Sequence, residues 1–229
     1  MSTRSPRGPY AKTAAKRKLI LEAALAAYAE AGTRGVSVKD IAARVGMTDA
    51  GVLHHFGSRE ALLTAVLEAR DAAAAEVHGE AGTLWRTDLL AENVATPGLV
   101  KLFVDLAAAA AEPEHPAHDF FQERYRTIRT ALAAILSQGR PATEAAVPAT
   151  ERPDPAWAAR MLLAATDGLQ LQWLLDPSID MAGDLARLRD TLIDALERTD
   201  SADSTDSADS TDSTDSADST GRTDGPDRT

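Results

Sequence analysis

The stretch SVKDIAARVGMTDAGVLHHFGSREAL, residues 37–62, contains two short helical segments separated by a single glycine. Ser37 and Asp40 have the spacing of a capping box, in which each side chain bonds the backbone amide of the other residue at a helix start. Gly46 suits the positive φ of a sharp turn, and Thr48 can cap a second helix only two residues later. The stretch therefore predicts a helix-turn-helix.

The apolar residues of this stretch separate an inner face from an outer one. Ile41 and Val45 lie on one side of the first helix, and Val52 and Phe56 lie one turn apart in the second. The residues left facing outward in the second helix are Asp49, Ala50, Gly51, His54 and His55. Such a helix can enter the major groove of DNA, although a helical hairpin that only packs within the protein has the same spacing.

The rest of the chain favours helices throughout. Alanine, leucine, glutamate and arginine dominate, β-branched residues are sparse, and no stretch alternates as a strand does. The sequence therefore predicts an all-α fold of about nine helices. The expected helices cover about residues 11–31, 37–45, 48–56, 58–77, 83–94, 96–111, 116–138, 154–176 and 178–198.

Both ends of the chain differ in composition from its centre. Residues 200–229 repeat Asp, Ser, Ala and Thr without an aromatic or large aliphatic side chain. Such a segment cannot bury enough apolar surface to offset its ordering entropy. We therefore expect a disordered acidic tail over residues 200–229 and a disordered basic arm over residues 1–10.

The net charge of −11 is unevenly distributed along the chain. Residues 1–60 contain ten Lys or Arg and five Asp or Glu, a net charge of +5. Residues 61–199 contain twelve Lys or Arg and twenty-one Asp or Glu, and residues 200–229 contain two Lys or Arg and nine Asp or Glu. The acidic pI of about 4.9 therefore does not exclude a nucleic-acid partner, because the positive charge is concentrated at one end.

Cysteine usage and hydropathy restrict the class of protein further. The chain has no cysteine, which excludes disulfides, thiolate zinc sites and cysteine nucleophiles. Glu22 and Glu30 interrupt the first apolar run, which has helical spacing, so no signal peptide is expected. The longest later run contains Lys101 and Asp105 and is too short to span a bilayer. We expect a cytoplasmic protein without a membrane partner.

Residues 13–63 resemble the N-terminal domain of the TetR family of bacterial transcriptional regulators. The resemblance includes the long first helix, the turn VSVKDIAARVGMT and the entry FGSREAL to the fourth helix. The later segments GLVKLFVDLAAAAAEPEHPAHDFFQERY and DGLQLQWLLDP look like the ligand-binding domain of a TetR subgroup. The resemblance thus covers most of residues 13–197.

The resemblance implies a helix-turn-helix DNA-binding domain over residues 11–57 and a larger ligand-binding and dimerisation domain over residues 58–199. It implies a homodimeric, sequence-specific regulator of transcription, a repressor that a small-molecule effector releases from a palindromic operator in double-stranded DNA. No cofactor is expected. The alternative is a helical ligand-binding or protein-interaction module that no longer binds DNA.

The resemblance also implies which residues face DNA. The recognition-helix positions are Thr48, Asp49, Ala50, Gly51, Leu53, His54 and His55. Lys39 is expected near a phosphate, and Arg59 matches a position that often contacts the DNA phosphate backbone. Leu53 replaces the tyrosine of many relatives, and Asp49 replaces a common lysine. Asp49 can accept from a cytosine amino group or can simply favour the helix start.

In this family the effector pocket lies among the middle helices and the last two helices form the dimer. The expected pocket residues are Trp85, Phe103, Phe120, Phe121, Tyr125, Asp167, Gln170 and Trp173. The expected dimer residues are Trp157, Met161, Ala164, Gly168, Leu175, Leu185, Leu188, Leu192 and Leu196. Each pocket residue is more often an ordinary core residue than part of a ligand site, and both interpretations stay open. The dimer residues also have the spacing of an intramolecular core face, and there the resemblance decides for the dimer. A neutral or cationic effector is expected, since no basic cluster accompanies the pocket residues.

His115 and His118 carry metal-ligand chemistry beside Glu114 and Asp119. Pro116, however, indicates a helix start, at which these residues are ordinary, and we predict no metal site. An enzyme using these side chains is the remaining alternative. No nucleophile motif, phosphate-binding loop or paired-carboxylate spacing supports it, so the sequence predicts a protein that is not an enzyme.

Overall fold

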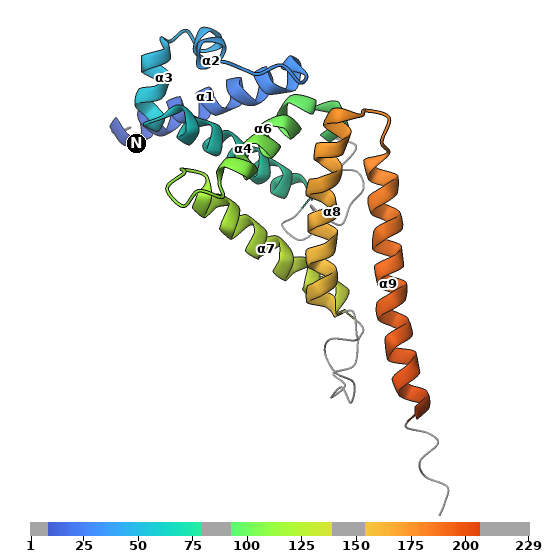
Figure 1. The fold of residues 1–229 in the computed structure, drawn as a ribbon. Coiled ribbons are helices and arrows are strands. Elements are labelled where there is room, and N and C mark those ends of the chain that lie inside the picture. Colours follow the sequence, from blue (N-terminus) through green and yellow to red (C-terminus); the bar gives the residue numbers. More distant parts are fainter. Residues whose placement is uncertain (1–8, 79–92, 139–153, 207–229) are drawn as a thin grey trace, which may run out of the picture.

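The computed structural model describes residues 9–78, 93–138 and 154–206, and within these ranges the chain is all-α, as predicted. The described helices are α1 (Pro9–Ala31), α2 (Val38–Arg44), α3 (Asp49–Phe56), α4 (Arg59–His78), α6 (Pro97–Ala109), α7 (His118–Leu136), α8 (Pro155–Leu175) and α9 (Met181–Asp206). Helices α1, α2 and α3 form one end of the molecule, and α8 and α9 run beside each other away from it (Figure 1). Most of the helix expected over 83–94 lies outside the described residues.

The helix-turn-helix has the predicted local structure. The Ser37 hydroxyl accepts from the Asp40 amide at 3.1 Å, and the Asp40 carboxylate accepts from the Ser37 amide at 3.0 Å, which completes the capping box. Gly46 has φ of 63°, so the chain turns sharply there. The Thr48 hydroxyl then accepts from the Gly51 amide at 3.1 Å and caps α3.

A single apolar cluster joins the helix-turn-helix to the helices that follow it. It contains fully buried Ile20, Ile41 and Val52 from α1, α2 and α3, and continues through α4 and α6 to Phe121 of α7. The first half of α4 contributes several of its members, so the boundary expected between residues 57 and 58 falls inside one core. The helix-turn-helix therefore shares its core with the first half of α4.

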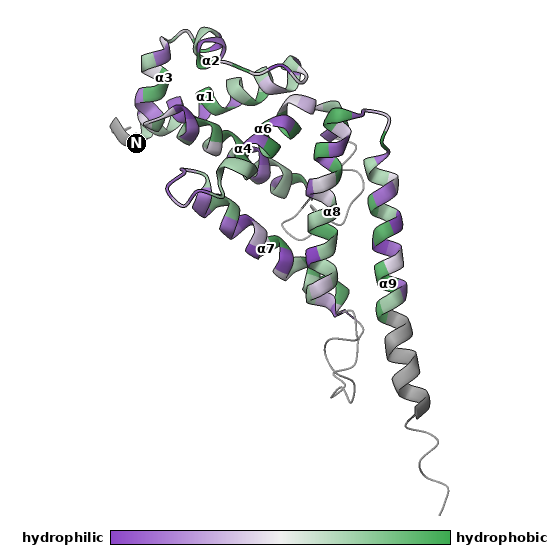
Figure 2. Cartoon of the chain, in the orientation of Figure 1, coloured by the Kyte–Doolittle hydropathy of each residue, from purple (hydrophilic) through white to green (hydrophobic). Residues whose placement is uncertain are grey.

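A second apolar cluster holds α7, α8 and α9 together. Leu132 and Leu136 of α7 meet Ala158 and Leu162 of α8, and Leu192 of α9 is buried against them. Figure 2 shows α8 as an apolar helix along most of its length, flanked by the more polar α7. These helices form a bundle that extends the molecule away from the helix-turn-helix.

Three element ends differ from the sequence prediction. Helix α1 begins at Pro9, inside the expected arm, because proline is well suited to the first turn of a helix. Helix α7 begins at His118 rather than Pro116, after the turns of residues 110–117. Helix α9 continues to Asp206, beyond the end expected at residue 198. Extending an existing helix gains a hydrogen bond per residue and needs no buried surface.

In the part of the chain that the structure describes, no helix is long and apolar enough to cross a lipid bilayer.

Gly98 provides a test of how closely α6 must approach α1. A Cβ atom at this position would lie 2.3 Å from the Tyr28 carbonyl oxygen and 2.6 Å from that of Gly32. Gly98→Ala should therefore reduce the free energy of unfolding by about 1–3 kcal/mol, as forced overpacking does. Gly35→Ala is the control, because a Cβ there has no heavy atom within 4 Å. Equal urea midpoints for the two variants would contradict the close packing.

Candidate nucleic-acid interface and effector site

The expected DNA-facing residues lie on the outer surface of α3 and its entry turn. Thr48, Asp49, Ala50 and His54 are exposed, while Val52 between them is fully buried. The remaining candidates, Gly51, Leu53 and His55, are partly exposed. The N-terminal turn of α3 therefore presents small and polar groups to a partner, and its free amides favour phosphate.

Lys39 and Arg59, expected at the phosphate backbone, lie on either side of α3 in the sequence. Both are exposed, and Arg59 forms a long ion pair with Glu60, at 3.9 Å between Nη1 and Oε1. Arg44 of α2 is engaged within the protein, because its guanidinium forms two hydrogen bonds to the Glu30 carboxylate of α1. The second of these bonds is 2.6 Å long and ties α2 to α1.

Arg17 has a role that the sequence does not indicate. Its guanidinium donates to the backbone carbonyl of His55 and lies over the Phe56 ring, with Cζ 4.2 Å from the ring centroid. The positive charge thus meets the carbonyl end of α3, where the helix dipole favours it. Arg17, which belongs to the basic run at the start of the chain, orients the recognition helix on α1.

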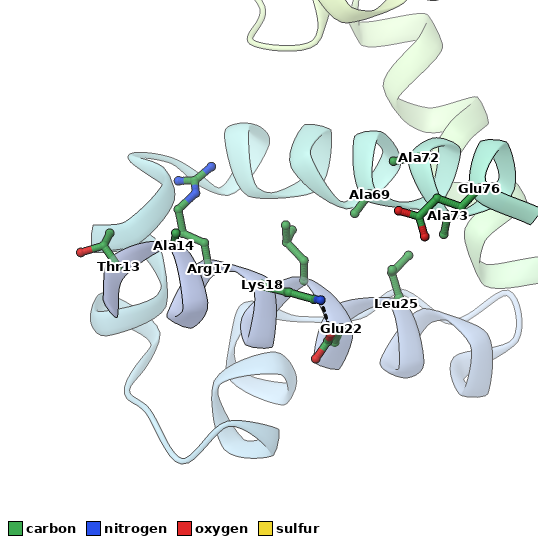
Figure 3. A pocket seen from close by; sticks show the side chains of 11 residues that line it. Thr13, Ala14, Arg17, Lys18, Glu22, Leu25, Ala69, Ala72, Ala73 and Glu76 are labelled. Carbon is green, nitrogen blue, oxygen red and sulfur yellow. Dashed lines mark ion pairs between the residues drawn. The ribbon is translucent and has the colours of Figure 1, made fainter. Parts of the chain in front are cut away.

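An open groove of about 850 Å³ lies between α1 and the second half of α4 (Figure 3). Ala69, Ala72 and Ala73 form its α4 wall, and their small side chains leave the space open. On the α1 side, Lys18 and Glu22 form a long ion pair of 3.9 Å. The second half of α4 is consequently less closely held by α1 than the first half.

Aromatic candidates for the effector site gather where α6 meets α7. The Phe103 and Phe121 ring centroids are 5.4 Å apart, Phe120 lies 5.1 Å from Phe121, and Tyr125 lies 5.9 Å from Phe121. Phe103 and Phe121 are buried, whereas Phe120 and Tyr125 are partly exposed. These rings form one apolar wall.

Two side chains of α8 carry oxygen acceptors, and the first of them bonds a residue of this wall. The Tyr125 hydroxyl donates to the Asp167 carboxylate at 2.7 Å, and Gln170 follows one turn later. The Gln170 side chain is only 6% exposed, and its Oε1 atom has no hydrogen-bond partner among the described residues. A buried acceptor without a donor is costly, which marks the position as a candidate for ligand binding.

Burial governs the ionisation of both groups in the Tyr125–Asp167 pair. Desolvation raises the pKa of the Asp167 carboxyl above its usual value, although the Tyr125 hydrogen bond and the Arg124 charge act in the opposite direction. Desolvation also raises the pKa of the Tyr125 hydroxyl, and the neighbouring Asp167 charge raises it further. Tyr125 therefore stays protonated and remains a donor to Asp167.

The other expected pocket residues are not part of this site. Trp173 is buried in a separate cluster with Val100 and Met181 rather than among the rings of α6 and α7. Its helical spacing suits a core position equally well, and the turn before α9 packs over it. Trp85 lies outside the described residues. We define the candidate effector site as Phe103, Phe121, Tyr125, Asp167 and Gln170.

The expected dimer residues of α8 and α9 have different surroundings. On α8, Trp157, Met161 and Leu175 are 38%, 37% and 80% exposed, Ala164 is exposed, and Gly168 is partly exposed. Leu171 adds a further exposed apolar side chain, at 47%, which the sequence analysis missed. The resulting spacing of three and four residues forms one apolar stripe.

The leucines of α9 correct the prediction. Leu185, Leu192 and Leu196 are buried against α7 and α8 within the same chain, and Leu188 also packs there. They therefore belong to the intramolecular core. Periodicity identifies an apolar face but not the surface that covers it.

His115 and His118 serve the turn before α7. The His118 Nδ1 atom lies 2.9 Å from the Ala110 carbonyl oxygen and its Nε2 atom lies 2.9 Å from the Gln122 amide nitrogen. The His115 Nδ1 atom accepts from the Ala117 amide at 3.1 Å. Over the described ranges, no three metal-ligating side chains gather in one place.

Comparison with known families agrees with this geometry. Residues 20–66 match the model of the tetR family of bacterial regulatory proteins, and residues 80–201, more than half of the chain, match the C-terminal domain of BetI-type transcriptional repressors. The chain belongs to the TetR family. It is a DNA-binding regulator of transcription that responds to ligand, and this family consists of regulators rather than enzymes.

Individual relatives extend along most of this TetR-family chain. The transcriptional regulator TtgR of Pseudomonas putida is 29% identical over 197 residues, covering 79% of this chain and 90% of TtgR. A structure concerning control of antibiotic production by bacterial hormones is 31% identical, has a TM-score of 0.52, and covers 79% of this chain and 97% of its own.

A transcriptional regulator assigned to Pseudomonas aeruginosa PAO1 shares the fold. It has 21% identity and a TM-score of 0.55, with 81% of this chain and 91% of that chain covered.

Lys39 tests the assignment of the phosphate-contacting surface in this TetR-family protein. Lys39→Ala should weaken binding to all DNA sequences alike and reduce the slope of log affinity against log salt by about one, because one fewer phosphate is neutralised. The measurement is fluorescence anisotropy with labelled duplexes at several salt concentrations. Lys101→Ala on α6 is the control, and its slope should match that of the wild type. Loss of affinity for one preferred sequence only would contradict a phosphate role.

Proposed function

We propose that this protein is a homodimeric repressor that binds a palindromic operator through α3 and is released by a small-molecule effector. The exposed outer surface of α3 carries the proposal. Its first turn presents Thr48, Asp49 and Ala50, and its buried Val52 fixes which side faces outward. Asp49 and His54 are the side chains with hydrogen-bonding groups for base edges.

We infer that the apolar stripe of α8 packs against a second copy of this chain. Four large side chains on one helix, Trp157, Met161, Leu171 and Leu175, are exposed in the single chain. Two such stripes can pack against each other about a twofold axis, with Gly168 allowing close approach. A twofold axis would present two α3 helices to half-sites one helical turn apart.

The candidate effector site favours a molecule with an apolar ring and a hydrogen-bond donor or positive charge. Its wall is aromatic, and its polar groups, the Asp167 carboxylate and the Gln170 Oε1 atom, are acceptors. An anionic effector would be repelled by the Asp167 carboxylate. The related structure that concerns bacterial hormones supports a small signalling molecule as the kind of effector.

Selection of bound sequences from random duplex DNA tests the proposal. The full-length protein should enrich a palindrome with half-sites one helical turn apart. His54→Ala should alter base preference within each half-site, since this exposed side chain faces outward near the middle of α3. Enrichment of no sequence by a folded dimer would support the alternative, a helical module that no longer binds DNA.

The α8 stripe supplies a test of the dimer. Met161→Glu should yield a folded monomer by analytical ultracentrifugation, because two buried carboxylates would face each other across the axis. Its operator affinity should fall roughly a hundredfold or more, since a monomer reads one half-site. Val77→Glu is the control, because Val77 is 75% exposed on α4, away from the stripe. A dimeric Met161→Glu variant would rule out this interface.

A further inference from the structure

Helix α4 is held differently along its two halves. Leu62, Val66 and Leu67 of the first half are buried in the cluster shared with the helix-turn-helix. The second half borders the groove of Figure 3 through Ala69, Ala72 and Ala73, so α1 holds it less closely. A force applied to the second half can therefore tilt α4 and move the core that positions α3.

An ion pair attaches the second half of α4 to α7. The Arg124 Nε atom donates to the Asp71 carboxylate at 2.7 Å, and their side chains are 16% and 34% exposed. The Arg124 Cζ atom also lies 4.9 Å from the Phe103 ring centroid, in the aromatic wall of the candidate effector site. Partial burial strengthens this interaction relative to the ion pairs on the protein surface.

Arg124 is also coupled to the acceptor side of the effector site. It is adjacent in sequence to Tyr125, whose hydroxyl bonds Asp167. The positive charge of Arg124 acts on the Asp167 carboxyl and lowers its pKa against the effect of burial. Arg124 thus contacts the Asp71 carboxylate of α4 and the Phe103 ring of the effector site, and its charge also acts on Asp167.

We infer that Arg124 is the positioning residue that transmits occupancy of the effector site to α4, an inference that rests on the proposed function. A donor or positive group bound at Asp167 neutralises the attraction that this carboxylate exerts on Arg124. The guanidinium is then attracted by Asp71 alone, and the balance between α7 and α4 shifts. Because α4 shares its core with α3, the favoured spacing of the two recognition helices in the dimer changes.

The substitution Asp167→Asn tests the inference without an effector, because it removes the same negative charge. In the full-length protein it should raise the Kd for the selected operator about fivefold or more, in the range of ordinary allosteric coupling. In an Arg124→Gln background the same substitution should change the Kd less than about twofold, since the route to α4 is already cut. In an Asp71→Asn background, Asp167→Asn should likewise change the Kd less than about twofold.

The Glu123–Arg126 ion pair supplies the matched control on the same helix. Its side chains are 62% and 65% exposed, and the Arg126 guanidinium bonds the Glu123 carboxylate of the same helix. In an Arg126→Gln background, Asp167→Asn should keep its full effect on operator affinity. A merely structural role for Arg124 would lower the melting temperature but leave the effect of Asp167→Asn unchanged.

The outcomes separate the inference from the proposed function. If Asp167→Asn changes the operator Kd equally in the wild-type and Arg124→Gln backgrounds, the inference is overturned. Operator binding by the wild type would still support the proposed repressor. Failure of the wild type to select any DNA sequence would overturn both. If Arg124→Gln does not fold, Arg124→Met replaces it, because methionine removes the charge but keeps a long unbranched side chain. Methionine should likewise reduce the effect of Asp167→Asn on operator affinity, and an undiminished effect would count against the inference.

Discussion

The close approach of α6 to α1 at Gly98 is the contact on which the rest of the structure depends. With no Cβ at this position, the start of α6 lies directly against the backbone carbonyls that end α1. This approach lets Leu99, Leu102 and Phe103 of α6 enter the same apolar cluster as Ile20 of α1. The DNA-binding helices therefore share one core with α4, α6 and the start of α7.

A shared core turns the helix-turn-helix into a part of the larger domain. Buried Val52 fixes the rotation of α3, and Arg17 holds its C-terminal end on α1. The exposed first turn of α3 thus has a defined orientation relative to α4 and α6. A repressor needs this property, because a ligand can release DNA only if its binding alters the placement of the recognition helices.

The polar groups beside the aromatic wall are unfavourable for stability. Asp167 is partly buried, with its pKa raised by desolvation, and the Gln170 Oε1 atom has no donor among the described residues. Buried acceptors of this kind are commonly retained where a ligand satisfies them. In the proposed function, an effector would supply the donor that the Gln170 Oε1 atom lacks.

Much of the fold was predictable because the signals are local. The Ser37–Asp40 capping box, the positive φ of Gly46 and the inward Ile41 and Val52 are fixed by residues within one or two helical turns. Helix ends in the turns before α7 and at the C-terminal end of α9 were predicted less well, since weak local preferences compete there with helix propagation.

The candidate sites could be predicted only in part. The outward residues of α3 follow from helical periodicity, and the family resemblance named most of the effector-site residues. No sequence signal pairs Arg124 with Asp71, which lies 53 residues away, or marks Arg17 as the support of α3. Local hydrogen bonding and periodicity thus determined which segments are helical and which faces are apolar. Only tertiary packing decided that the α9 leucines lie inside the chain, because the same periodic face can be covered by its own chain or by another.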